Sequence, residues 1–104
     1  MNAPLVVRTR KAQGDFKHIY AWIAQDSGHV RAAEVLSRID RMAERLALRP
    51  RMGRVRRDFD GEPRVFTVAP WMIVYETLPN DAGIQVLRLI DSRRDVATLL
   101  GKKS

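Results

Sequence analysis

Three arginines and an aspartate near the end of the chain are the polar residues with the clearest potential for chemistry. Arg88, Arg93 and Arg94 place three guanidinium groups within seven residues, and Asp91 lies among them. Guanidinium groups bind carboxylates and phosphates through paired hydrogen bonds. Asp91 and Asp95 could pair with two of these arginines, but exposed ion pairs contribute only about 0–1 kcal/mol each. We therefore expect Arg88, Arg93, Arg94 and Asp91 to form a surface that binds a target, with internal ion pairing as the alternative.

A second concentration of arginines lies near the middle of the chain. Residues 49–57 contain five arginines, interrupted by a proline and a glycine: Arg49, Arg51, Arg54, Arg56 and Arg57. Two interpretations stay open for this segment. It is either a solvated loop whose charge is balanced by Asp58, Asp60 and Glu62, or a contact for phosphate groups or an acidic partner.

Most catalytic chemistries lack the residues that they need in this sequence. The chain has no cysteine and only two histidines, His18 and His29, which excludes thiol nucleophiles, zinc ribbons, iron–sulfur sites and histidine-based metal sites. We expect both histidines on the surface, and we predict no catalytic residue, no metal and no cofactor. A metal-free ribonuclease stays open, because arginines such as Arg64 can stabilise transition-state charge. Asp91 is its candidate base, but the arginines around it should lower the pKa of Asp91 and weaken it.

Length and composition indicate one globular domain with an acidic partner. The chain has 104 residues, 45% of them hydrophobic, so we predict a single domain over residues 1–104. Its 19 basic and 12 acidic residues give a net charge of +7, and 15 of the basic residues are arginine. Such a charge favours nucleic acid or an acidic polypeptide as a partner. No targeting sequence or membrane span is recognisable, so we expect a soluble, cytoplasmic protein.

The first half of the chain predicts one strand and two helices. Residues 4–9 are rich in β-favouring side chains and indicate a strand. Apolar residues at positions 16, 19, 20 and 23 have helical spacing, and Gly28 marks the end of this helix. A second helix with the same periodicity follows and is closed by Pro50. Two helices joined by so few residues form an antiparallel hairpin.

The second half predicts strands and a final short helix. Strands are expected at 64–68, 71–78 and 84–90, with a turn at 79–83, a short edge strand near Val55 and a helix over 95–100. The nearly continuous apolar run at 71–78 is typical of a central strand covered on both faces. We predict an α+β fold, with an N-terminal strand, an antiparallel helical hairpin packed on a three- to four-stranded antiparallel sheet, and a short C-terminal helix.

Three segments of the sequence resemble the ParE toxins of bacterial toxin–antitoxin modules, within the wider RelE/ParE superfamily. These segments are residues 16–23, 49–78 and 84–100. The family pattern has a proline and a glycine after the second helix, an arginine that begins the next strand, an apolar strand ending in tyrosine, and a last strand that runs into Arg-Asp. Here the corresponding residues are Pro50, Gly53, Arg64, Tyr75 and Arg94-Asp95.

The resemblance implies the toxin of a type II toxin–antitoxin module. Such a protein has a RelE/ParE-like fold, inhibits DNA gyrase and is neutralised by a cognate ParD-like antitoxin, with which it forms a hetero-oligomer. The target-binding residues would then be those near the C-terminus, namely Arg88, Arg93, Arg94 and Asp91. The antitoxin or another polyanion would contact a second set, namely Arg54, Arg56, Arg57, Arg64 and Trp71.

RelE-like endoribonucleases, which cleave mRNA on the ribosome, are the alternative within the superfamily. The nucleases carry further basic groups on the sheet where this chain has Phe66 and Met72, and many carry a histidine where it has Asp91. These differences favour an inhibitor of gyrase over an enzyme. A nucleic-acid-binding module without toxicity is a third interpretation.

Overall fold

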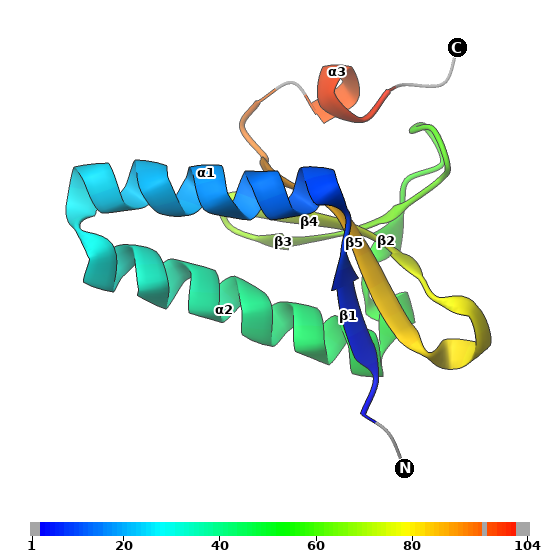
Figure 1. Cartoon of the computed structure of the whole chain (residues 1–104). Helices are drawn as coiled ribbons and strands as arrows, with labels where there is room; N and C mark the ends of the chain where they lie inside the picture. The colour runs from blue at the N-terminus through cyan, green and yellow to red at the C-terminus, as the bar shows by residue number, and fades with distance from the viewer. Residues whose placement is uncertain (1–2, 95, 102–104) are drawn as a thin grey trace.

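The computed structural model describes residues 3–94 and 96–101. Within them, two long antiparallel helices run side by side along a five-stranded sheet, and a short third helix follows the last strand (Figure 1). In chain order the elements are β1 (Leu5–Arg8), α1 (Arg10–Ser27), α2 (His29–Leu48), the 3-10 turn η1 (Pro50–Met52), β2 (Arg54–Val55), β3 (Arg64–Val68), β4 (Trp71–Thr77), the 3-10 turn η2 (Pro79–Asp81), β5 (Gly83–Asp91) and α3 (Val96–Leu100).

The strand order of the sheet is β1-β5-β4-β3-β2. Strands β2 to β5 pair antiparallel, as the sequence predicts, and β2 is the expected edge strand near Val55. The sheet nevertheless has five strands and is mixed, because β1 pairs parallel with β5. The helical hairpin carries the chain from one edge of the sheet to the other, which leaves β1 free to pair with the last strand. Gly83 permits this pairing, since its φ is 138° and a Cβ there would lie 2.0 Å from the carbonyl oxygen of Leu5.

The helical hairpin is fixed at its start and at its turn. Thr9 caps α1, because its Oγ1 accepts a hydrogen bond from the Ala12 N–H at 3.1 Å. The same hydroxyl donates to the carbonyl oxygen of Leu87 on β5 at 2.8 Å, so the cap also ties the helix to the sheet. Gly28 alone separates α1 from α2, with a φ of 89°. Both helices and this glycine lie where the sequence predicts them.

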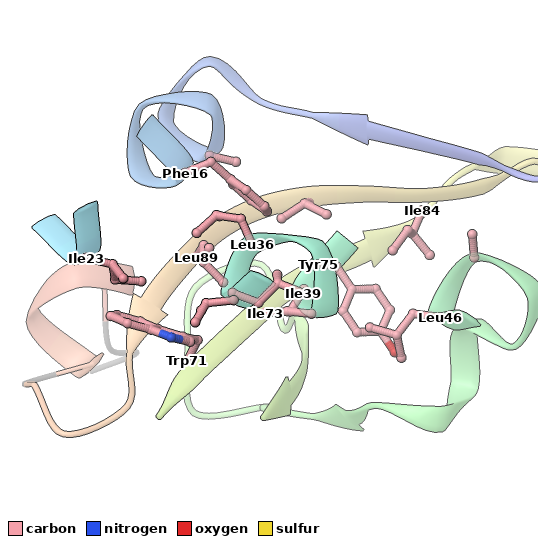
Figure 2. Close-up of a cluster of buried hydrophobic side chains, with 14 of the residues drawn as sticks. Phe16, Ile23, Leu36, Ile39, Leu46, Trp71, Ile73, Tyr75, Ile84 and Leu89 are labelled. Atoms are coloured by element: carbon pink, nitrogen blue, oxygen red, sulfur yellow. The ribbon is translucent and has the colours of Figure 1, made fainter. Parts of the chain in front are cut away.

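Strand β4 is covered on both faces, as its apolar run predicts. Trp71, Ile73 and Tyr75 pack toward the helical hairpin (Figure 2). Met72 and Val74 point to the opposite face and belong to a second apolar cluster, against which side chains of α3 pack. The short C-terminal helix therefore covers the face of the sheet that the hairpin leaves open.

Strand β5 contains a bulge that changes which side chains share a face. Leu87 has no partner on β4 where the register between the two strands shifts. The extra residue reverses the alternation of side chains along the strand. Before the bulge, Val86 packs in the cluster on the hairpin side, and after it Ile90 packs in the cluster under α3. Arg88 lies two residues before Ile90 and shares its face.

Candidate functional site

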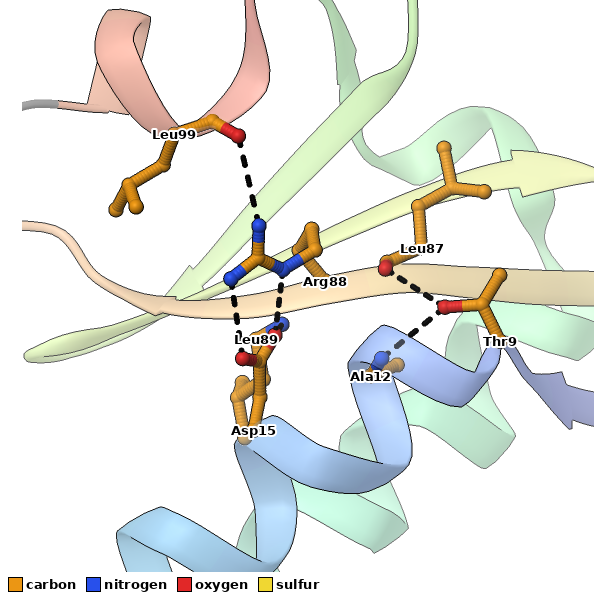
Figure 3. Close-up of polar contacts among 7 residues, drawn as sticks. All are labelled: Thr9, Ala12, Asp15, Leu87, Arg88, Leu89 and Leu99. Atoms are coloured by element: carbon orange, nitrogen blue, oxygen red, sulfur yellow. Dashed lines mark hydrogen bonds and ion pairs between the residues drawn. The ribbon is translucent and has the colours of Figure 1, made fainter.

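Arg88 joins three elements of the fold (Figure 3). Its Nε and Nη2 donate to the carboxylate oxygens of Asp15 on α1, at 2.8 and 3.1 Å, and its Nη1 donates to the carbonyl oxygen of Leu99 on α3 at 3.4 Å. The hydrogen bond to Asp15 raises the pKa of Arg88, so the guanidinium stays charged. The sequence predicts a target contact at Arg88. The structure shows its guanidinium engaged within the fold.

Side chains of α1 continue the hydrogen bonding of β1 along the edge of β5. The last residue of β1, Arg8, lies opposite Val86. Further along β5, the N–H of Leu89 donates to Oδ2 of Asp15 at 3.0 Å, next to the hydrogen bond that Thr9 donates to Leu87. These contacts replace the strand–strand hydrogen bonds that a longer β1 would make. Beyond the end of β1, the edge of β5 therefore lies between α1 and α3 and pairs with no strand of the described chain.

A cleft of about 430 Å³ lies at this open edge, and we call it the edge cleft. It combines aromatic and aliphatic groups with an imidazole and several charges. Its lining residues are Asp15, His18, Ile19, Trp22, Trp71, Arg88, Leu89, Ile90, Asp91, Arg94 and Leu99. The cleft thus brings together residues of α1, β4, β5, the β5–α3 connection and α3.

Asp91 is bound by the arginine two residues after it. The Nε and Nη2 of Arg93 donate to the Asp91 carboxylate at 2.9 and 2.6 Å, and the backbone N–H of Arg93 donates at 3.0 Å. These hydrogen bonds lower the pKa of Asp91, as the sequence predicts, although Arg88 takes no part. The ionised carboxylate is held by a cation and is a weak general base.

Arg94 is the arginine of this group whose guanidinium forms no hydrogen bond or ion pair within the part of the chain that the structure describes. Its backbone N–H donates to the carbonyl oxygen of Asp91 at 3.0 Å, which fixes the turn after β5. Its side chain is exposed and lines the edge cleft, where it forms no hydrogen bond or ion pair with any described residue. His18 is exposed, as predicted, and faces the same cleft from α1. The edge cleft is therefore lined by three of the four predicted target-binding residues, Arg88, Asp91 and Arg94, and of these Arg94 is the best placed to bind an external group.

Two tryptophans form an aromatic wall that the sequence does not predict. Trp22 is 59% exposed, and it meets Trp71 edge to face with ring centroids 6.4 Å apart. Trp71, a predicted antitoxin contact, is only 6% exposed and belongs to the core. One signal for Trp22 is present in the sequence: the residue lies outside the apolar spacing of its helix, so its ring has no place in the core.

Two of the arginines that the sequence assigns to an antitoxin contact are paired within their loop. Arg56 donates to both carboxylate oxygens of Asp58 at 3.0 and 2.8 Å, and its guanidinium lies 4.1 Å from the ring centroid of Phe59. Arg57 lies 3.8 Å from Glu62. Both arginines therefore have an acidic partner within the loop, as expected for a solvated loop with balanced charge.

Arg64 and Tyr75 stabilise the turn that follows α2. The Tyr75 hydroxyl donates to the carbonyl oxygen of Pro50 at 2.6 Å and accepts from the N–H of Gly53 at 2.9 Å. Arg64 Nη1 donates to the carbonyl oxygen of Gly53 at 2.8 Å. A Cβ on Gly53 would lie 2.3 Å from the Tyr75 hydroxyl, so this close approach requires glycine. Arg64 thus supports the fold, while Arg54 remains exposed.

The described residues contain neither a group of metal ligands nor a helix that could span a membrane. In the ranges 3–94 and 96–101, no three histidine, cysteine or acidic side chains are grouped so that they could hold a metal ion. No helix in the same ranges has the length and apolar character needed to cross a membrane. The chemistry available in the edge cleft is that of guanidinium, carboxylate, imidazole and indole groups.

Comparison with known proteins identifies the fold first and then the family. A chain of the solved structure described as "Chromosomal ParDE TA system from P. aeruginosa" aligns with a TM-score of 0.71, covering 86% of this chain and 96% of that chain at 22% sequence identity, which shows a shared fold. Residues 6–96 match the family described as "ParE toxin of type II toxin-antitoxin system, parDE". Toxin ParE3 of Caulobacter vibrioides is 35% identical over 99 residues, which are 95% of this chain and 97% of that protein. The chain therefore belongs to the ParE toxin family of type II toxin–antitoxin systems.

Proposed function

We propose that this chain acts as a single-domain toxin that inhibits DNA gyrase in the cytoplasm and is neutralised by a cognate ParD-like antitoxin. The observation that carries the proposal is the family match over residues 6–96, reinforced by 35% identity along nearly the whole of Toxin ParE3. An inhibitor needs a binding surface and no catalytic group. The edge cleft supports this reading, because it presents a free guanidinium beside an exposed tryptophan.

The gyrase contact is centred on Arg94 in this proposal. Arg93 is also exposed, but its pair with Asp91 occupies its guanidinium. Asp91 and Arg88 then act by positioning: Asp91 fixes the turn that carries Arg94, and Arg88 fixes α3 beside the cleft. The four residues form one surface, in which Arg94 makes the contact and the others shape it.

The antitoxin contact includes Arg54 and Arg57, which are the most exposed arginines of the predicted set. A disordered acidic segment can order against such side chains when it binds. Arg56, Arg64 and Trp71 contribute by supporting the surface, since each is engaged inside the fold. The resulting complex is a hetero-oligomer of toxin and antitoxin.

A ribosome-dependent endoribonuclease is the second candidate, because the edge cleft brings His18 and Arg94 together. An imidazole can transfer the proton of a 2′-hydroxyl, and a guanidinium can stabilise the charge of the transition state. Two observations favour inhibition without catalysis. Asp91 is held ionised by Arg93, and the Tyr75 hydroxyl is committed to the turn after α2, so neither is available as an acid–base group.

A gyrase supercoiling assay with Arg94→Glu tests the proposed function. The wild-type protein should inhibit supercoiling, and its expression without antitoxin should cause filamentation while transcripts stay intact. Arg94→Glu should lose the inhibition, because it replaces a free cation by a carboxylate in the same cleft. Arg10→Glu is the matched control, since Arg10 is exposed at the start of α1 and does not line the cleft.

Both variants should keep the thermal unfolding and the antitoxin binding of the wild type. Full inhibition by Arg94→Glu would remove this residue from the gyrase contact. Cleavage of mRNA at ribosomal positions by the purified protein, lost in His18→Ala, would instead establish the endoribonuclease and contradict gyrase inhibition.

A further inference from the structure

We propose that a second cleft, at the C-terminal end of α2, binds the phosphodiester backbone of duplex DNA. This turn cleft has a volume of about 810 Å³ and is lined by residues 49–52, Arg64, Thr77 and Asp81. It shares no lining residue with the edge cleft. DNA binding here goes beyond gyrase inhibition and does not depend on it, because it is a property of the toxin alone.

Three arginines from three elements line the turn cleft. Arg49 follows the last residue of α2, Arg51 lies inside η1, and Arg64 begins β3. The guanidinium groups of Arg49 and Arg51 form no hydrogen bond or ion pair with any described residue, and both side chains are exposed. Arg64 binds the turn through Nη1, which leaves Nε and Nη2 for a ligand. The cleft therefore offers guanidinium groups that form no ion pair with the described residues.

Hydrogen bonds fix the backbone of the turn at residues 49–53, which carries Arg49 and Arg51. Tyr75 binds the turn at Pro50 and at Gly53, and Arg64 binds the carbonyl oxygen of Gly53. The N–H of Met52 donates to the carbonyl oxygen of Arg49 at 3.0 Å, which closes η1. A ligand that binds here finds the backbone already ordered, so little conformational entropy of the turn is lost on binding.

The net charge of the turn cleft is positive when its acidic residue and the helix dipole are included. Asp81 is the acid among the described lining residues, and it offsets one of the three arginines. The C-terminus of α2 adds about half a negative charge from the helix dipole, which leaves about +1.5 at the cleft. Burial raises the pKa of Tyr75, so its hydroxyl stays neutral and adds no negative charge.

The lining of the turn cleft favours duplex DNA over the other polyanions. Single-stranded RNA is bound largely by stacking of its bases on aromatic rings, and no aromatic residue lines this cleft. Acidic peptides are anchored by apolar side chains in pockets, whereas the apolar groups here are limited to Pro50 and Met52. Duplex DNA presents phosphates at its surface and needs only the guanidinium groups that the cleft provides.

Fluorescence anisotropy with a short labelled duplex of mixed sequence tests this proposal. Binding is measured at NaCl concentrations from about 50 to 200 mM, so that the salt dependence is obtained. The double variant Arg49→Ala/Arg51→Ala should bind about ten-fold more weakly at about 100 mM NaCl. The slope of log K against log salt should fall by about 1.8, the value for two lost phosphate contacts.

A second double variant, Arg38→Ala/Arg41→Ala, is the matched control. It removes the same charge from the exposed face of α2, outside the turn cleft. Arg41 lies eight residues before Arg49, which is about 12 Å along the helix axis and exceeds the Debye length near 100 mM salt. The control should therefore weaken DNA binding less than about three-fold. Arg49→Gln/Arg51→Gln keeps polar side chains without the charge and should match the alanine pair. It replaces the alanine pair if that pair does not fold.

Equal weakening by the control and the alanine pair would overturn the proposal, because diffuse charge would then explain binding. Tighter binding of single-stranded RNA, or displacement of the duplex by polyglutamate through the same arginines, would overturn the assignment to DNA. Gyrase supercoiling is assayed in parallel. A wild-type protein that binds DNA through Arg49 and Arg51 but does not inhibit gyrase would contradict the proposed function alone.

Discussion

Replacement of Asp15 by asparagine tests whether Arg88 anchors α1, β5 and α3 to one another. In Asp15→Asn, an amide group takes the place of one acceptor oxygen and the charge that faces the guanidinium disappears. The N–H of Leu89 also donates to the carboxylate of Asp15, and in the variant its acceptor is a neutral amide. The side chains of Arg88 and Asp15 are 21% and 15% exposed, so water compensates little for these losses.

The expected cost follows from this partial burial. Removing one partner of a fully buried ion pair costs about 3–5 kcal/mol, and exposed pairs contribute about 0–1 kcal/mol. Hydrogen bonds to charged groups contribute about 1.5–3 kcal/mol. For the intermediate burial of Arg88 and Asp15 we expect a loss of about 2–3 kcal/mol. In a domain of this size each kcal/mol corresponds to about 4–8 °C, so Tm should fall by roughly 10–20 °C.

Asp91→Asn supplies the control within the same segment of the chain. Asp91 also pairs with an arginine through two hydrogen bonds, but Arg93 is 66% exposed. Water can solvate the released guanidinium, so this variant should be destabilised much less than Asp15→Asn. Urea and thermal denaturation of both variants give the comparison directly.

Hydrogen exchange of the α3 amides separates the anchoring role from a general loss of stability. Arg88 donates to the carbonyl oxygen of Leu99, and Asp15 orients the guanidinium for that bond. Exchange in α3 should therefore accelerate in Asp15→Asn by more than the global loss of stability requires, and stay unchanged in Asp91→Asn. Equal destabilisation by the two variants, or unaltered α3 protection in Asp15→Asn, would refute the anchoring role of Arg88.

Two further predictions concern Tyr75 and Asp91. Tyr75→Phe leaves the buried N–H of Gly53 and the carbonyl oxygen of Pro50 without their partner, so the free energy of unfolding should fall by about 2–3 kcal/mol, and an unchanged urea midpoint would contradict this. The pKa of Asp91 is lowered in the folded state, so its contribution to stability is present above the ordinary pKa near 4 and is lost as the pH falls through the lower folded value. The free energy of unfolding should therefore decline less steeply below about pH 4 in Asp91→Asn than in the wild type. An equal decline in the two proteins would contradict this role of Asp91.

The helices and the meander are predictable from sequence because their signals are local. Apolar residues at helical spacing, with Gly28 and Pro50 as boundaries, define the two helices and their hairpin. The apolar run of β4 indicates coverage on both faces, and the structure confirms this through the hairpin on one side and α3 on the other. The pairing of β1 is different, because β1 meets β5 across more than seventy residues and its four residues carry no pattern that specifies a partner.

The surroundings of Arg88 are not predictable from local pattern. Strict alternation from Ile84 would place Val86, Arg88 and Ile90 on one face of β5. The bulge at Leu87 instead leaves Val86 on the hairpin side and moves Arg88 and Ile90 to the face under α3. The partner of Arg88 is Asp15, a residue of the first helix, so neither the face nor the contact follows from the neighbouring sequence.

Four of the residues that carry the family resemblance share one structural role. Pro50, Gly53, Arg64 and Tyr75 are spread over 26 positions, yet they meet at one turn. Tyr75 binds Pro50 and Gly53, Gly53 is small enough to accept the tyrosine ring, and Arg64 binds the carbonyl oxygen of Gly53. These four residues thus mark a structural support for the turn cleft, and in our proposal the exposed arginines beside it bind DNA.

The distribution of partners among the arginines explains why net charge alone is a poor guide to binding in this protein. Arg8 pairs with Asp40, Arg88 with Asp15 and Arg93 with Asp91, so much of the positive charge is neutralised within the fold. The guanidinium groups of Arg49, Arg51 and Arg94 have no such partner among the described residues and lie in two separate clefts. An exposed cation gains more from an external anion when no internal carboxylate competes for it. An external polyanion that binds these guanidinium groups would therefore leave the ion pairs that stabilise the fold undisturbed.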